Sequence, residues 1–136
     1  MKKSPIVLLV DRVKTRVKHG LKFEQNFNLD SDVQIEETKV GYTLLSGEEA
    51  ICVRQFINTG KSKIVEGNVN VPIAVNTAGF AKVKETKQLK FNKVTNERNV
   101  FVTALYDNDF TQDFDVEVHE NSLKIKIDNT KFYIDL

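Results

Sequence analysis

Apolar and polar residues alternate with a period of two along most of this chain. From Leu21 to Leu29 every second residue is apolar, with Gln25 as the single interruption, and the residues between them are polar. Side chains of a β-strand point alternately to its two faces, so this pattern predicts a strand with one face in water. No segment carries apolar residues at helical spacing.

Further stretches predict strands on the same grounds. The chain opens with the apolar run 6–10, and Pro72 in the stretch "NVNVPIAVNTAGF" favours an edge strand or a connection there. The other predicted strands are 32–37, 39–45, 49–57, 81–85, 87–93, 99–106 and several within the last 24 residues. About ten strands without helices predict a single all-β domain spanning residues 1–136, built as a two-sheet antiparallel β-sandwich. Phenylalanines within these alternations are predicted to lie in the core, namely Phe23, Phe27, Phe91, Phe101, Phe114 and Phe132.

The C-terminal segment can be interpreted down to its pairing. A tight turn at Glu120-Asn121 predicts the apolar pairs Val118–Leu123, Val116–Ile125 and Phe114–Ile127, with Glu117–Lys124 and Asp115–Lys126 on the other face. A second turn at Asn129-Thr130 predicts the pairs Ile127–Phe132, Ile125–Ile134 and Leu123–Leu136. Three strands would then share one apolar face.

Charge and composition narrow the classes of partner. Twenty basic and nineteen acidic residues leave a net charge of +1, which gives no bulk electrostatic reason to expect nucleic acid or a membrane surface as partner. The run 6–10 is too short for a membrane span or a signal-peptide core, and nothing indicates a compartment. The single cysteine, Cys52, lies in an apolar stretch and favours a small buried hydrophobe over a nucleophile.

No complete catalytic or metal-binding constellation is present. Asp115, Glu117 and His119 share one strand face at a spacing that could ligate a divalent metal. The lysines predicted opposite both carboxylates favour ion pairs instead, so no metal or other cofactor is predicted. Arg54, Tyr42 and His19 could each serve acid–base chemistry, but no spacing brings the three together, and no catalytic residue is assigned.

Two stretches resemble heparinase II/III-like proteins. The first, "IVLLVDRVKTRVKHGLKFEQNFNLDSDV", has a hydrophobic strand ending in an Asp-Arg pair, a basic turn with a histidine, and a second strand running to "F-x-L-x-x-D". The matching residues are Asp11, Arg12, Val13, His19, Phe23, Phe27, Leu29 and Asp32. The second, "AKVKETKQLKFNKVTNERNVFVTALYD", is similar to the distal part of such domains and ends in "F-x-T-x-L" at Phe101, Thr103 and Leu105. The likeness covers residues 5–136.

The resemblance implies a role within a larger enzyme. Members of this family are polysaccharide lyases with an N-terminal helical toroid followed by antiparallel sheets of the supersandwich type. This chain would be the C-terminal β domain, with the toroid as its partner and the catalytic residues upstream. Many relatives end the second strand in a Phe-His pair that can contribute to a zinc site; here Phe27 is followed by Asn28, a poor zinc ligand.

The basic segment before Gly20 is the candidate substrate contact. Lys14, Arg16, Lys18 and His19 could hold an acidic polysaccharide on one wall of the lyase groove, although an ordinary solvated turn is the simpler interpretation. Two alternatives remain open: a stand-alone carbohydrate-binding module, for which exposed aromatics are few, and a purely structural β-sandwich.

Overall fold

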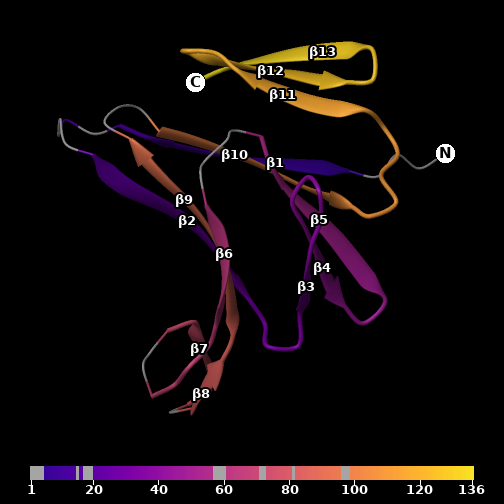
Figure 1. Cartoon of the computed structure of the whole chain (residues 1–136). Coiled ribbons are helices and arrows are strands. Elements are labelled where there is room, and N and C mark those ends of the chain that lie inside the picture. Colours follow the sequence, from indigo (N-terminus) through magenta and orange to yellow (C-terminus); the bar gives the residue numbers. More distant parts are fainter. Residues whose placement is uncertain are drawn as a thin grey trace. The chain divides into compact units, whose positions relative to one another are not determined.

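The computed structural model describes residues 5–14, 16, 20–56, 61–70, 73–80, 82–95 and 99–136. Within these residues every regular element is a β-strand, and the fold is an all-β sandwich of antiparallel sheets, as predicted (Figure 1). The chain forms two compact units, which are described separately. The expectation of one domain spanning residues 1–136 remains a prediction.

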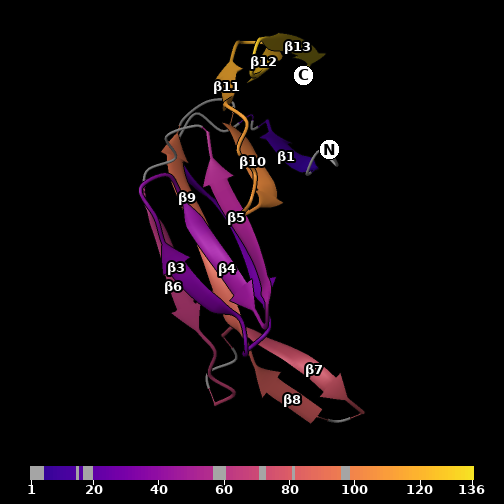
Figure 2. The ribbon, with the colours of Figure 1, turned by 90° about the vertical axis from the view of Figure 1, so that its right-hand side faces the viewer.

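Unit 1 comprises residues 1–14, 35–58 and 98–136. Its strands are β1 (Ile6–Val13), β3 (Gln34–Glu37), β4 (Tyr42–Ser46), β5 (Glu49–Gln55), β10 (Asn99–Asp107), β11 (Phe114–Val118), β12 (Ser122–Ile127) and β13 (Thr130–Asp135). A five-stranded sheet has the order β1-β10-β5-β4-β3, and a three-stranded sheet has the order β11-β12-β13. Figures 1 and 2 show the smaller sheet lying against the end of the larger one where β1 and β10 pair.

The two sheets of unit 1 enclose a common core. Alternate residues of β10, including Val102 and Ala104, face Phe114, Val116, Leu123 and Ile125 of the smaller sheet, and all six are buried. Such burial of apolar surface is the main stabilising term in a sandwich of this kind. The predicted core role is thus confirmed for Phe114.

Strand β10 is buried on both of its faces. Phe101 and Thr103, which point away from the core just described, are 2% and 0% exposed. The Thr103 hydroxyl accepts a hydrogen bond from Nε2 of Gln55 on β5 at 2.6 Å, which satisfies a polar group that would otherwise be costly to bury. A central strand covered on both faces explains why residues 100–106 are almost continuously apolar.

Unit 2 comprises residues 15–34 and 59–97. Its strands are β2 (Leu21–Leu29), β6 (Ser62–Glu66), β7 (Val75–Gly79), β8 (Lys82–Glu85) and β9 (Lys87–Thr95). They form a three-stranded sheet of order β2-β9-β6 and the hairpin β7-β8. Leu89 and Phe91 of the central strand are buried, and Phe91 makes an edge-to-face contact with Phe27 at 6.1 Å between ring centroids.

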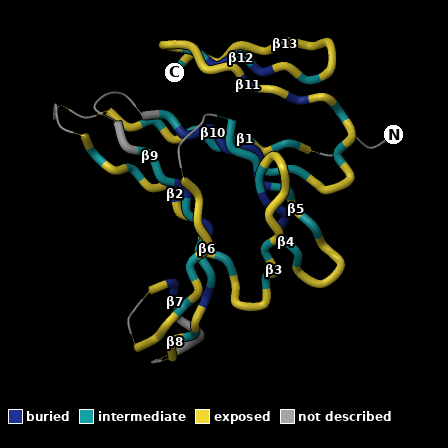
Figure 3. The backbone as a smooth tube through the Cα atoms, in the orientation of Figure 1, coloured by how far each residue is buried: buried dark blue, intermediate teal, exposed yellow. Residues whose placement is uncertain are grey.

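The alternation in β2 has the consequence expected from the sequence. Leu21, Phe23, Phe27 and Leu29 are half-buried, and the polar residues between them are exposed, as Figure 3 shows by the changing colour along β2. Gln25, the one polar residue in the apolar series, is 8% exposed and lies opposite Phe91. Position in the alternation therefore decides burial here, even for an amide side chain.

The structure corrects several predictions about strands. Strand β6 was not expected; it is a short, mostly exposed strand of five residues, and such strands carry a weak period-two signal. Strand β7 lies within the stretch 68–80, where an edge strand or a connection was predicted, and it forms one edge of the two-stranded sheet β7-β8. Pro72 lies outside the described residues. The turn and register of Glu120-Asn121 are confirmed pair by pair.

The second C-terminal register is wrong by two residues. Ile127 pairs with Thr130, Ile125 with Phe132, and Leu123 with Ile134, so the turn consists of Asp128 and Asn129. Asp128 adopts a positive φ of 51°, which short polar side chains tolerate and which suits a two-residue hairpin. Phe132 is 48% exposed, so its predicted core role is also wrong.

Candidate functional site

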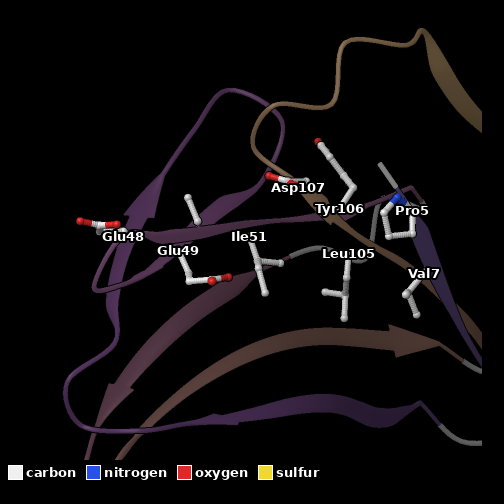
Figure 4. Close-up of a pocket in the computed structure, with 9 residues that line it drawn as sticks. Pro5, Val7, Glu48, Glu49, Ile51, Leu105, Tyr106 and Asp107 are labelled. Atoms are coloured by element: carbon white, nitrogen blue, oxygen red, sulfur yellow. The ribbon is translucent and has the colours of Figure 1, made fainter. Parts of the chain in front are cut away.

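An apolar hollow with an acidic rim lies on the five-stranded sheet of unit 1. It has a volume of about 510 Å³ and is shown in Figure 4. The residues around it are Pro5, Val7, Glu48, Glu49, Ala50, Ile51, Leu105, Tyr106 and Asp107. They come from β1, from β10 and from the β4–β5 hairpin, so antiparallel pairing gathers segments that are far apart in the sequence.

Strand register explains the apolar floor. Val7 lies opposite Leu105, and Asp107 lies opposite Ile51, which places these residues on the face of the sheet turned away from the core with β11 and β12. Val7 and Ile51 are 50% and 46% exposed. The hollow thus offers apolar surface to a ligand or partner.

The rim of the hollow has the wrong charge for an acidic sugar. Glu48 and Glu49 follow the turn at Gly47, whose φ is 61°, and Asp107 ends β10. Three carboxylates around an apolar floor attract cations and repel uronate or sulfate groups. This hollow is therefore not where an acidic polysaccharide would bind.

Sequence reasoning missed this hollow. Val7 belongs to the first apolar run, in which no residue stands out as exposed. Only its pairing with Leu105 shows that it lies on the exposed face. The consecutive carboxylates of Glu48-Glu49 were visible in the sequence, but their proximity to Asp107 depends on the neighbouring strands β5 and β10.

The basic segment is described only in part. Lys14 and Arg16 are both exposed. Exposure fits a sugar contact and a solvated turn equally well. Lys18 and His19 lie outside the described residues. The proposed four-residue substrate contact is therefore untested.

The acidic face of β11 forms an ion pair, as its sequence predicted. The Lys124 ammonium lies 2.6 Å from Oε2 of Glu117, and the ring Nε2 of His119 lies 3.7 Å from the same oxygen. The hydrogen bond from Lys124 lowers the pKa of Glu117, and the same bond raises the pKa of Lys124. Lys126 pairs with Asp115 in the strand register, but its ammonium lies nearer Asp113, at 3.9 Å.

Asp115 and Glu117 do not belong to a metal-binding cluster within the described part of the chain. Among the described residues, no group of three histidine, cysteine or carboxylate side chains is arranged to hold a metal ion. Asn28 accepts a hydrogen bond at its Oδ1 from Nε2 of Gln88 at 2.7 Å. That amide oxygen therefore already serves the β2–β9 pairing.

The catalytic candidates Arg54 and Tyr42 point to opposite faces of one sheet. Tyr42 lies opposite Val53, the neighbour of Arg54 in β5, and it is 6% exposed. The Arg54 guanidinium lies 4.3 Å from the centre of the Phe56 ring and donates a hydrogen bond to the Phe114 carbonyl at 3.2 Å. Arg54 thus ties the two sheets of unit 1 together, and the two side chains cannot act on one bond.

A cluster of aromatic rings surrounds Phe114, whose carbonyl binds Arg54. Phe56, Tyr106 and Phe110 all contact Phe114, with centroids between 4.9 and 6.4 Å away. Burial, followed by the nearby Cys52 thiol, raises the pKa of Tyr106. This cluster packs the sandwich and presents no aromatic row for stacking a sugar.

Cys52 is half-buried beside polar partners. Its Sγ donates to Oδ1 of Asn108 at 3.4 Å and lies 3.9 Å from the Thr43 hydroxyl. It fills a small space beside Tyr106, its cross-strand neighbour on β10. The prediction of a small buried hydrophobe is therefore only partly met, because the thiol is half-buried and hydrogen-bonded to a polar side chain.

Comparison with known proteins adds no relative. No protein-family model, no curated protein and no solved structure matches this chain. Within the part of the chain that the structure describes, no helix is long and apolar enough to cross a membrane.

Proposed function

We propose that this chain is the C-terminal, non-catalytic β domain of a heparinase II/III-like polysaccharide lyase. The parent enzyme would cleave uronic-acid-containing polysaccharide by β-elimination, and this domain, of the supersandwich type, would form one wall of the substrate groove beside an upstream helical toroid. Catalytic residues would come from the upstream part.

One observation carries this proposal. The two stretches that resemble the family, residues 6–33 and 81–107, are far apart in the sequence, yet they contain strand partners. Strand β1 pairs with β10 along its whole length, and β2 pairs with β9 along its whole length. Val7, Leu9 and Asp11 lie opposite Leu105, Thr103 and Phe101, the residues of the second motif. The two stretches are thus neighbours in the fold, which is what one β domain carrying both motifs requires.

The positions of the motif residues fit structural roles. Phe101 and Thr103 are buried in β10, whereas Asp11 lies near the end of β1, just before the basic segment. The resemblance therefore falls on residues that build the sheet and lead into the segment proposed to contact sugar.

Sugar binding by the basic segment can be tested by NMR titration with a uronic-acid oligosaccharide. The proposal predicts shift changes centred on residues 14–19, and their loss in the double variant Lys14→Glu/Arg16→Glu. Lys39→Glu/Lys61→Glu, which changes the same number of exposed charges elsewhere, is the matched control and should leave binding intact. Equal losses in both variants would mean that binding is only nonspecific attraction, and no shift at any position would contradict the proposed contact.

A further inference from the structure

Strand β13 has an open edge. In the described part of the chain β12 is its only strand neighbour, and all six of its residues are exposed (Figures 1 and 3). Phe132, Tyr133 and Ile134 are 48%, 68% and 43% exposed. An open edge with apolar side chains is a template for pairing with another strand.

The turn determines which backbone groups are open. Ile127 and Thr130 flank the two-residue turn, so Thr130 and every second residue after it direct their backbone groups toward β12. Leu136 belongs to this series, and its N–H donates a hydrogen bond to the Asn121 carbonyl at 2.8 Å. Lys131, Tyr133 and Asp135 therefore direct their N–H and C=O groups away from the sheet.

The charges of β13 are not matched across β12. Lys131 lies opposite another lysine, Lys126, and Asp135 lies opposite Ser122. Like charges at directly opposite positions disfavour a strand pair, and neither Lys131 nor Asp135 has an oppositely charged residue directly across from it on β12.

We propose that β13 is a self-association edge, which pairs with β13 of a second copy of this chain in antiparallel orientation about Tyr133. In that register each Lys131 lies opposite Asp135 of the other copy, and each Phe132 lies opposite Ile134. The three residues with open backbone groups are also those that meet as hydrogen-bonded pairs. Charge, apolar contact and backbone geometry thus all agree on a single register, and two three-stranded sheets become one of six strands.

The other edge of the same sheet lacks this complementarity. Strand β11 carries Asp115 and Glu117 on one face, and an antiparallel pair about Val116 would place each carboxylate opposite another. Like charges protect that edge from self-pairing. The contrast selects β13 as the associating edge.

Sedimentation equilibrium of the full chain tests this proposal. A single strand pair gives a small interface, so we expect a monomer–dimer equilibrium with a Kd on the order of 10 µM. Lys131→Glu and Asp135→Lys should each weaken association about tenfold or more, and the double variant, which exchanges the two charges, should restore it. Lys39→Glu is the matched control for a lysine reversed elsewhere and should leave association unchanged.

A backbone variant separates this edge from other interfaces. Tyr133→Pro removes an N–H that points away from β12, so the fold, followed by circular dichroism of the dilute protein, should persist while the dimer is lost. A chain that stays monomeric up to about 300 µM, well above the expected Kd, would overturn the proposal. A dimer whose Kd is unchanged by the single reversals Lys131→Glu and Asp135→Lys would overturn it equally.

Discussion

The two C-terminal hairpins share the strand β12 and the same alternation of residues, but they differ in burial and in predictability. In the β11–β12 hairpin the apolar residues Val116, Leu123 and Ile125 are at most 5% exposed. In the β12–β13 hairpin the partners of Leu123 and Ile125 are Ile134 and Phe132, and both are more than 40% exposed. Alternation therefore fixes the face to which a side chain points, whereas the opposing sheet decides whether that face is buried.

Truncating one residue on each strand should give the largest difference. Ile125→Ala should lower the free energy of unfolding by about 2–5 kcal/mol, because it leaves a cavity in a closed core. Phe132→Ala should cost only about 1 kcal/mol, because half of that ring is already in water. Urea denaturation of dilute protein, where a β13 dimer is dissociated, gives both values, and equal losses would mean that the two faces are wrongly assigned.

Substitutions in the two turns should give the second-largest difference in the free energy of unfolding. Asp128 has a positive φ, its Oδ1 accepts the Asp113 N–H at 3.0 Å, and its Oδ2 accepts from Nε2 of Gln112 at 2.7 Å. Asp128→Val should cost about 2 kcal/mol from backbone strain and lost acceptors, and Asp128→Gly should cost less, because glycine is unstrained there. Glu120→Val in the first turn, where no positive φ occurs, is the control with a smaller loss. Denaturant midpoints that rank glycine below valine would refute this account of the turn.

The exposed ion pair of the first hairpin should have the smallest effect. The pKa of Glu117 is lowered below 4.5, so its contribution to stability is present above that value and is lost as the pH falls through the folded pKa. The pKa of Lys124 is raised above 10.5, so its contribution is present below that value and is lost as the pH rises through the folded pKa. Lys124→Ala should therefore be slightly less stable than the original at neutral pH and equal to it at strongly acidic pH. Thermal melts across this range test the pairing, and a difference that persists in acid would contradict it.

The same contrast explains how much the sequence could predict. Strands with one solvent-exposed face, such as β2, could be predicted because one face must be polar and the other apolar, which gives a period of two. The β11–β12 register could be predicted because apolar residues match on both sides of one turn. The second register failed because apolar residues at every second position match equally well after a shift of two, and only the conformation of Asp128 selects one.

The candidate site was less predictable than the fold. The hollow near Val7 depends on which long-range strands pair, and the open edge of β13 depends on which strand lacks a second neighbour. Neither property is encoded in a local pattern. The basic segment was visible as a run of charges, but a run of charges has the same appearance in a binding site and in a solvated turn.

The central proposal is that this chain is the β domain of a polysaccharide lyase and does not supply its chemistry. The most direct test follows the ultraviolet absorbance of unsaturated uronate released from heparin, alginate and hyaluronan, by the isolated chain and by the chain joined to the upstream helical toroid that the proposal expects. β-Elimination needs a carboxylate-neutralising group, a base and an acid at one point, and Arg54 and Tyr42 lie on opposite faces of their sheet. We expect no release from the isolated chain and release from at least one polysaccharide by the joined protein. Turnover by the isolated chain that is abolished by Tyr42→Phe or His19→Ala, or a joined protein inactive on all acidic polysaccharides, would contradict the claim.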